Sequence, residues 1–270
     1  MERPVICTIK EVIEESPSVK TFLVDKEFDF KPGQFAMVWI PGVDEKPFGF
    51  STKTGFSVAK VGEFTEKMHS LKEGDSIGVR GPYGSYFEPF GDKVLAIAGG
   101  IGGAPIISAV EEFSKMNIDV TAIVGARTKE ELLFLDRFEK SGNVFPCTDD
   151  CSFGFPGFTT EKMKELLNEE KFDLIITCGP EIMMKKVVEI AKDHKIPVQV
   201  SMERYMKCGI GICGQCCVDD QGLCVCKDGP VFWGEKLKFI TEFGCYKRRG
   251  LVYIFLNYTL KITGQLKALN

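Results

Sequence analysis

Six of the chain's eleven cysteines lie close together in the stretch MKCGIGICGQCCVDDQGLCVCKDGPVF, residues 206–232. Three of them, Cys208, Cys213 and Cys216, have the spacing C-x4-C-x2-C, and Cys224 and Cys226 follow further along the chain. Thiolate sulfur is the usual protein ligand of iron–sulfur clusters, and this spacing followed by a distant fourth cysteine is that of the plant-type [2Fe–2S] site. The stretch therefore predicts an iron–sulfur centre, whose function is one-electron transfer.

A structural zinc site is the main alternative for these cysteines. Zinc favours two short cysteine pairs, and Cys213/Cys216 with Cys224/Cys226 would supply them, but the second pair has a single residue between its members and is cramped for a zinc ribbon. The loop also contains three glycines, Gly209, Gly211 and Gly214. A loop wrapped around a cluster needs unusual φ values and close N–H···S contacts, so these glycines favour the iron–sulfur prediction.

Two glycine-containing turns predict a second kind of chemistry. The segment VLAIAGGIGGAPIISAV carries four glycines where a buried strand passes into a helix: Gly99, Gly100, Gly102 and Gly103. There backbone N–H groups can approach a phosphate, and the positive end of the helix favours the anion. The segment TCGPEIMM repeats this arrangement after a later strand, with Cys178, Gly179 and Pro180. Taken alone, the first turn is equally consistent with a tight turn that needs small residues, and its spacing is not G-x-G-x-x-G.

Elements that position these residues are visible in the hydrophobic pattern. From residue 5 to about residue 89, short β-like runs such as VKTFLV, QFAMVWI and DSIGVRG alternate with Gly, Pro and Asp turn signals, which is typical of a small antiparallel barrel. From about residue 92, buried runs such as KVLAIAGG and FDLIITCG alternate with amphipathic segments such as APIISAVEEFSKM. This second pattern predicts a parallel sheet built from βαβ units.

We therefore predict an α/β-plus-β protein of several parts, as expected for a chain longer than roughly 100–200 residues. A β-barrel is expected over residues 1–91, a parallel-sheet nucleotide-binding domain over 92–200, and a small metal-held cysteine module over 201–246. The tail 247–270, which includes the β-prone run LVYIF, has no predicted role.

Composition excludes several classes of function. The formal net charge of −4 gives no reason to expect a nucleic acid or an anionic membrane as partner, and no apolar run is long enough to span a bilayer. We find no signal-peptide pattern, and an odd number of cysteines in a chain with ample core does not indicate a disulfide framework, so we predict a cytoplasmic protein. With only His69 and His194 available, histidine-based acid–base catalysis has little support, and we predict no catalytic side chain.

The order of these motifs resembles a known superfamily. The barrel, then GPYGSYF, AGGIGGAP, TDDCSFG and CGPEIMMK, is similar to the ferredoxin–NADP reductase superfamily, in which a flavin barrel precedes a nicotinamide-nucleotide domain. With CGIGICGQC and CKDGPVF added, the chain most resembles the electron-transfer subunits of NAD-dependent dihydroorotate dehydrogenases. The resemblance implies three cofactors: FAD, NAD(H) and a [2Fe–2S] cluster.

The resemblance also assigns site residues. The segment KPFGFS stands where the superfamily contacts its flavin, and KVGEFTEKM stands where it meets the diphosphate. The implied FAD residues are Lys46, Pro47, Phe48, Phe50, Ser51, Gly62 and Thr65. Lysine replaces the usual arginine at 46, and Gly49 stands where a hydroxyl residue is common.

For the nucleotide, the resemblance places Gly99, Gly100, Gly102 and Gly103 at the NAD pyrophosphate and Cys178, Gly179 and Pro180 beside the nicotinamide. For the cluster, the family pattern has its fourth ligand directly before KDGPVF. This selects Cys226 over Cys224, so the implied ligands are Cys208, Cys213, Cys216 and Cys226.

The implied function is electron transfer between NAD(H), FAD and [2Fe–2S], and on to or from the FMN of a separate catalytic subunit that oxidises dihydroorotate in pyrimidine synthesis. A hetero-oligomer is expected, because this chain is too short to contain a catalytic barrel as well. Two alternatives remain: an NAD(P)H-linked flavin and iron–sulfur subunit of a ferredoxin, sulfide or hydrogenase-type oxidoreductase, and a zinc-stabilised binding module without flavin.

Overall fold

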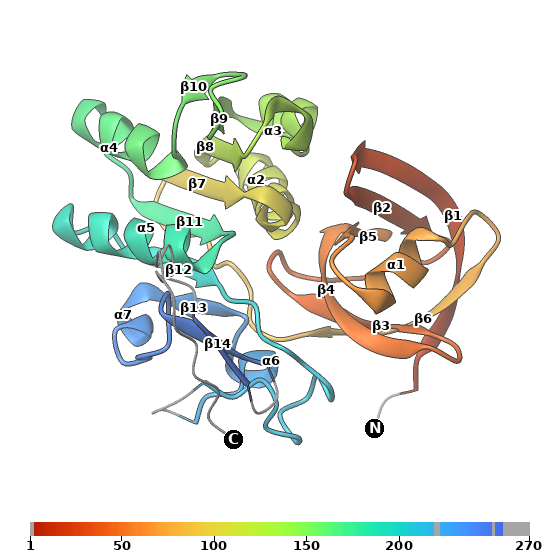
Figure 1. The fold of residues 1–270 in the computed structure, drawn as a ribbon. Helices are drawn as coiled ribbons and strands as arrows, with labels where there is room; N and C mark the ends of the chain where they lie inside the picture. The colour runs from red at the N-terminus through yellow and green to blue at the C-terminus, as the bar shows by residue number, and fades with distance from the viewer. Residues whose placement is uncertain (1–2, 219–221, 250–251, 256–270) are drawn as a thin grey trace, which may run out of the picture.

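The computed structural model describes residues 3–218, 222–249 and 252–255. Figure 1 shows a barrel on one side, a helix-covered sheet on the other, and a C-terminal part below the sheet that reaches towards the barrel. The predicted combination of an antiparallel barrel, a parallel sheet and a small C-terminal module is confirmed.

The N-terminal part is a closed barrel with the strand order β1-β2-β5-β4-β3-β6. Its elements are β1 (Val5–Ser16), β2 (Val19–Val24), β3 (Phe35–Ile40), β4 (Asp44–Thr52), β5 (Gly55–Ala59), α1 (Glu63–His69) and β6 (Ser76–Tyr83). All neighbouring strands are antiparallel, as the short connections between them require. The interior is aromatic, with Phe22, Phe50 and Phe56 fully buried. Full closure leaves the barrel without free strand edges.

The second part is built on a seven-stranded sheet with the order β10-β9-β8-β7-β11-β12-β13. Its elements are β7 (Lys93–Gly99), η1 (Gly100–Gly102), α2 (Gly103–Lys115), β8 (Asp119–Ala126), η2 (Lys129–Glu131), α3 (Leu135–Ser141), β9 (Asn143–Thr148), β10 (Phe155–Pro156), α4 (Thr159–Glu169), β11 (Leu174–Cys178), α5 (Glu181–Asp193) and β12 (Val198–Ser201). Strands β7 and β11 are central and buried on both faces, which explains their continuous apolar runs. Helices α2 and α3 pack on one face, and α4 and α5 on the other.

The C-terminal part continues from β12 into the cysteine loop. Its elements are α6 (Val225–Asp228), β13 (Val231–Trp233), α7 (Gly234–Leu237), β14 (Tyr246–Arg249) and β15 (Val252–Phe255). Strand β13 pairs antiparallel with β12, so the large sheet crosses the boundary predicted at residue 201. Strands β14 and β15 pair with each other, and β14 begins one residue before the predicted tail 247–270; residues 250–251 and 256–270 of that tail lie outside the described residues.

Contacts between the parts fix their relative positions. Arg137 of α3 donates a hydrogen bond to the carbonyl oxygen of Ser51 in the barrel at 2.8 Å. The amide of Gln199 in β12 accepts from the Glu88 N–H at 2.8 Å and donates to the Glu88 carbonyl at 2.7 Å, which holds the connection between barrel and sheet. Arg80 of β6 donates to the carbonyl oxygen of Cys208 at 2.9 Å, so the cysteine loop is anchored to the barrel.

Candidate cofactor sites

The cysteine loop is wound tightly and directs backbone N–H groups at sulfur. Gly209, Gly211 and Gly214 have φ values of 74°, 79° and 70°, a region that glycine adopts at little cost. The N–H of Gly211 donates to Cys226 Sγ at 3.1 Å, and the N–H of Ile212 donates to Cys208 Sγ at 3.3 Å. These contacts support the role that the sequence pattern predicted for the glycines, which is to give the loop unusual φ values and close N–H···S contacts.

Thiol acidity in the loop follows burial and these hydrogen bonds. Burial by itself would raise the pKa of Cys208, but hydrogen bonds from the backbone of Cys213, Ile210 and Ile212 lower it to about 6. The pKa values of Cys216 and Cys226 are raised, chiefly because both thiols are buried. Metal ligation removes these thiol protons, so binding a cluster would release them.

The structure separates the two cysteines between which the spacing alone could not choose. Cys226 Sγ lies against the ligand loop through Gly211, and the Cys226 N–H donates to Cys216 Sγ at 3.3 Å. Cys224 instead lies opposite Cys217 in an isolated antiparallel bridge. This arrangement supports Cys226 as the fourth ligand.

Geometry also bears on the choice of metal. A tetrahedral zinc site needs four ligands around one ion, whereas four cysteines hold the two irons of a [2Fe–2S] cluster between them. The donor set is thiolate with close N–H···S contacts, which fits the iron–sulfur cluster.

Two adjoining cavities offer a site for a flavin. The first, of about 320 Å³, lies where the barrel, the η1 turn and residues 201–206 meet, and Pro47, Phe48 and Thr65 line it. The second, of about 600 Å³, is lined by Lys46, Gly62 and Thr65. Val61 also lines both cavities, so the two form one continuous cradle.

Five of the seven residues predicted for FAD thus line this cradle. The other two, Phe50 and Ser51, line neither cavity. Phe50 is fully buried in the barrel core, whereas Ser51 is fully buried beside the first cavity, where its hydroxyl accepts a hydrogen bond at 2.8 Å from the cavity-lining Ser57. Phe50 thus packs in the barrel core, while the flavin contact predicted for Ser51 stays a prediction, because Ser51 lies directly behind Ser57 of the first cavity. The hydroxyl of Thr65 lies in the first turn of α1 and accepts hydrogen bonds from the N–H groups of Val61 at 2.8 Å and Gly62 at 2.9 Å.

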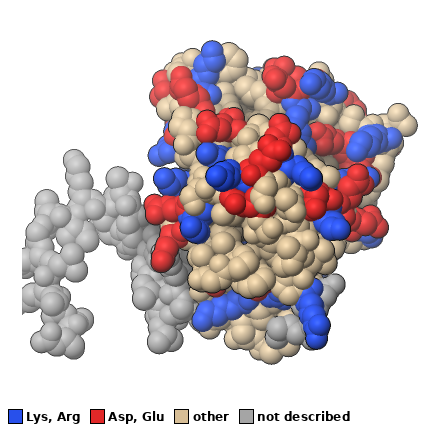
Figure 2. All heavy atoms as spheres, turned by 90° about the vertical axis from the view of Figure 1, so that its right-hand side faces the viewer, with Lys and Arg blue, Asp and Glu red and all other residues tan. Residues whose placement is uncertain are grey.

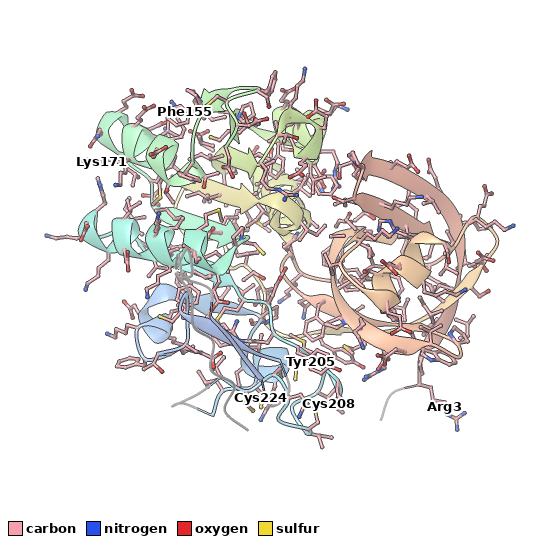
Figure 3. All side chains as sticks on the ribbon, in the orientation of Figure 1. Arg3, Phe155, Lys171, Tyr205, Cys208 and Cys224 are labelled. Carbon is pink, nitrogen blue, oxygen red and sulfur yellow. The ribbon has the colours of Figure 1, made fainter. Side chains whose placement is uncertain are left out.

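Sequence reasoning missed the residues that the C-terminal part adds to the cradle. Arg204 lines the first cavity, while Tyr205, Lys207 and Gln215 line the second. Figure 3 shows Tyr205 near Cys208 and Cys224, at the end of the molecule away from Phe155. The aromatic and basic composition of ERYMK was the available signal, but only the fold brings this segment against the barrel.

Arg204 is held by two carboxylates in the interior. Its guanidinium donates to Glu181 Oε2 at 2.9 Å and to Glu242 Oε1 at 2.7 Å, and Arg204 and Glu242 are 7% and 0% exposed. Burial would lower the pKa of Arg204, but the hydrogen bonds and charges of the two carboxylates raise it. The group therefore joins the start of α5 to the segment before the cysteine loop and to the segment after α7.

A third cavity, of about 540 Å³, lies at the carboxyl ends of the parallel strands and is lined by Gly99, Gly100 and Pro180. The two glycine turns are in contact: a Cβ at Gly102 would lie 2.3 Å from the Cys178 carbonyl oxygen, and one at Gly179 would lie 3.0 Å from Gly99. Only glycine fits such approaches. This is the edge of an open parallel sheet at which ligands bind.

The remaining nucleotide residues are close by. Gly103 opens α2 directly behind the turn, and Cys178 lines the flavin cavity rather than the nucleotide cavity. Ala59 and Ile101 line both cavities, so the two adjoin. Arg127 and Glu131 also line the nucleotide cavity, and Arg127 donates to Glu131 Oε1 at 2.7 Å and to Glu131 Oε2 at 2.9 Å.

Fold and cavities together define a class. The chain has the fold of a ferredoxin–NADP reductase-type oxidoreductase, with an added iron–sulfur part. A family model described as an oxidoreductase NAD-binding domain matches residues 96–189, and one described as the iron–sulfur cluster binding domain of dihydroorotate dehydrogenase B matches residues 203–238. A solved structure, described as an NADH-dependent reduced ferredoxin–NADP oxidoreductase in a study of flavin-based electron bifurcation, has a TM-score of 0.80 and 29% identity, covering 90% of this chain and 94% of that one.

Relatives of higher identity give the family. The chain is 82% identical over 248 residues to the probable dihydroorotate dehydrogenase B (NAD(+)) electron transfer subunit of Methanocaldococcus jannaschii, covering 92% of this chain and 96% of that protein. It is 48% identical over 257 residues to the subunit of the same name from Methanothermobacter thermautotrophicus, covering 92% of this chain and 96% of that protein. The chain belongs to the family of dihydroorotate dehydrogenase B electron transfer subunits. Family membership therefore supports the predicted electron-transfer subunit over both alternatives, the zinc-stabilised binding module and the ferredoxin-type oxidoreductase subunit.

No helix among the described residues is long and apolar enough to cross a membrane.

Proposed function

We propose that this chain carries electrons between NAD(H), FAD and a [2Fe–2S] cluster, and exchanges them with the FMN of a separate catalytic subunit that oxidises dihydroorotate. One observation supports this path above the others: the flavin cavity adjoins the nucleotide cavity at Ala59 and Ile101, and is bordered on another side by Met206, two residues before Cys208. Along the molecule, the nucleotide cavity is thus followed by the flavin cavity and then by the cysteine loop.

Each proposed cofactor fits the residues that line its site. When bound, flavin accepts the electron pair of a hydride and releases the electrons singly, which links NADH to a one-electron cluster. The apolar side chains of Phe48, Ile101 and Met206 would keep water from the ring, and the glycine turns would hold the pyrophosphate through backbone N–H groups. An electron-transfer path of this kind needs cofactors that are held in position, and it does not need acid–base side chains.

The cysteine loop offers an exit for the electrons. Cys213, Gly214 and Gln215 are exposed, and Ile212 has 75% of its surface accessible. An exposed apolar side chain beside a cluster ligand is suited to a protein partner. Figure 2 shows that the barrel face carries acidic and basic side chains interspersed, which is not the single-sign field that nucleic acids select. We propose that the catalytic subunit docks on the cysteine loop.

Reduced cysteines also bear on location. Four ligand thiols in a chain with eleven cysteines need a compartment that keeps thiols reduced, so we propose that the protein works in the cytoplasm.

The test is reconstitution in two stages. Purified anaerobically, the chain should contain FAD, iron and sulfide, and should reduce artificial dyes with NADH while leaving dihydroorotate unoxidised. Addition of an FMN-containing dihydroorotate dehydrogenase subunit should give NAD⁺ reduction by dihydroorotate. Oxidation of dihydroorotate by the isolated chain, or a preparation with zinc and no flavin, would refute the proposal.

A further inference from the structure

Two cysteines that the cluster does not require face each other beside it. Cys217 and Cys224 form an isolated antiparallel bridge. The hydrogen bonds flank the pair: the Val218 N–H donates to the Leu223 carbonyl at 2.9 Å, and the Val225 N–H donates to the Cys216 carbonyl at 3.1 Å. Cys217 and Cys224 are therefore a non-hydrogen-bonded pair, the register in which opposite Cα atoms are closest, at about 4.5 Å.

That register suits a covalent cross-link. Disulfides span Cα separations of about 4.4–6.8 Å, and side chains of directly opposite residues lie on the same face of the two strands. The two thiols are within hydrogen-bond reach of each other. The N–H of Cys224 also donates to Asp228 Oδ2 at 2.7 Å, which fixes the backbone of one partner.

Each member of the pair is close in the chain to a proposed ligand but is not itself one of the four proposed ligands. Cys217 directly follows Cys216, and its partner in the structure is Cys224 on the opposite segment. Cys224 precedes Cys226 by two residues, and both Cys217 and Cys224 are partly exposed. This inference rests on the proposed ligand set, which leaves both thiols unligated.

We propose that Cys217 and Cys224 form a reversible disulfide that ties together the two segments bearing the third and fourth cluster ligands. The oxidant is a low-molecular-weight disulfide. One cysteine thiolate attacks it and releases one small thiol, forming a mixed disulfide; the second cysteine then displaces the other small thiol. Two protein thiols lose two electrons and two protons, and one small disulfide becomes two thiols.

The cross-link has a consequence for the metal. It closes the short connection between Cys217 and Cys224, so the segments carrying Cys216 and Cys226 can no longer separate independently. A closed loop restricts the opened states through which iron is lost. In the disulfide form, loss of iron to a chelator should be about threefold slower or more.

The experiment uses the anaerobically purified holoprotein, equilibrated in buffers of oxidised and reduced glutathione, quenched with iodoacetamide and analysed by intact mass and peptide mapping. We expect alkylation to fall by two thiols on oxidation, with the link mapped to Cys217 and Cys224 and with iron, sulfide and FAD unchanged. Cys217→Ser and Cys224→Ser should each abolish the link. Cys151→Ser, at an exposed cysteine of the nucleotide-binding part, is the matched control and should leave it intact.

Two outcomes would overturn the inference. One is full alkylation of Cys217 and Cys224 at every glutathione ratio while iron and sulfide remain bound. The other is protection of Cys224 from alkylation under reducing conditions in the holoprotein, which would make it a ligand. Absence of iron from the wild-type protein would instead count against the proposed function, so the two failures are distinguishable.

Discussion

At the scale of single residues, the pairing of Arg127 with Glu131 decides which charges this part of the nucleotide cavity presents to a ligand. The guanidinium is exposed but held by both oxygens of Glu131, and Asp149 also lines the cavity. Burial and the neighbouring Asp150 raise the pKa of Asp149, a sign that negative charge is already crowded there. A ligand with an additional phosphate would meet the carboxylates of Glu131 and Asp149, so we predict that the site prefers NADH to NADPH.

Glu131→Gln should therefore relax this preference. Freeing Arg127 from its carboxylate partner makes its charge available to a 2′-phosphate, and we expect KM for NADPH to fall about threefold to fivefold, the range of a surface charge pair. Steady-state dye reduction with both nucleotides measures the effect. Glu130→Gln, at the exposed neighbour, is the control. An unchanged NADPH/NADH ratio would show that Arg127 does not face the ribose.

Cys226 and Cys224 provide a second residue-scale comparison. Because Cys226 Sγ lies within the ligand loop and Cys224 lies opposite Cys217, Cys226→Ser should lose most of the cluster iron, whereas Cys224→Ser should keep it. Iron and sulfide analysis with electron paramagnetic resonance of the reduced proteins gives the answer. Retention of a normal cluster signal in Cys226→Ser would contradict the assignment.

At the scale of elements, buried Arg204 joins three segments that are distant in sequence. It holds Glu181 at the start of α5 and Glu242 beyond α7, and Glu181 also accepts the N–H of Gly244 at 3.0 Å. Removing the arginine from this buried ionic network would leave two buried carboxylates without a compensating positive charge. Arg204→Met should lower the free energy of unfolding by about 3–5 kcal/mol, measured by urea denaturation.

The exposed ion pair of Arg127 and Glu131 provides the control for that measurement. Arg127→Met should leave the urea midpoint nearly unchanged, because solvent screens its pairing with Glu131. Equal midpoints for Arg204→Met and the wild type would mean that the buried network does not hold the C-terminal part in place.

The segment between β12 and the cysteine loop adds a basic side chain to the proposed FAD site. Lys207 and Tyr205 line the same cavity as Lys46, and the Lys46 ammonium lies 5.7 Å from the centre of the Tyr205 ring. If this cavity holds the ADP half of FAD, Lys207→Gln should raise the Kd for FAD about threefold to fivefold and leave riboflavin binding unchanged. Flavin fluorescence titration of the apoflavoprotein measures both, with Lys10→Gln as the control. Equal weakening of FAD and riboflavin binding would show that Lys207 does not contact the ADP half of FAD.

At the scale of the whole molecule, the cysteine loop is where the proposed path reaches the surface. Ile212 is exposed beside Cys213, so Ile212→Asp should weaken coupling to the catalytic subunit by about tenfold, as expected when a charge enters an apolar contact. NADH-dependent dye reduction by the isolated chain should be unaffected. Met116→Asp, at an exposed methionine at the end of α2, is the control. Normal coupling in Ile212→Asp would exclude docking at this loop.

Local sequence determined much of this architecture. Turn signals and short apolar runs predicted the barrel, alternating buried runs and amphipathic segments predicted the parallel sheet, and cysteine and glycine spacing predicted the cluster loop and the phosphate turn. These features are local, because a turn, a helix face or a ligand loop is specified by residues a few positions apart.

Only the tertiary structure decided which side of a strand meets a ligand and which distant segments meet each other. Phe50 lies in the same strand as Lys46 and Phe48, yet its side chain packs in the core of the closed barrel. The addition of β13 to the sheet, the buried bonds of Arg204 and the facing of Cys217 by Cys224 all depend on long-range contacts. Such contacts carry no periodic signal in sequence, because register and packing between distant segments are set by the whole fold.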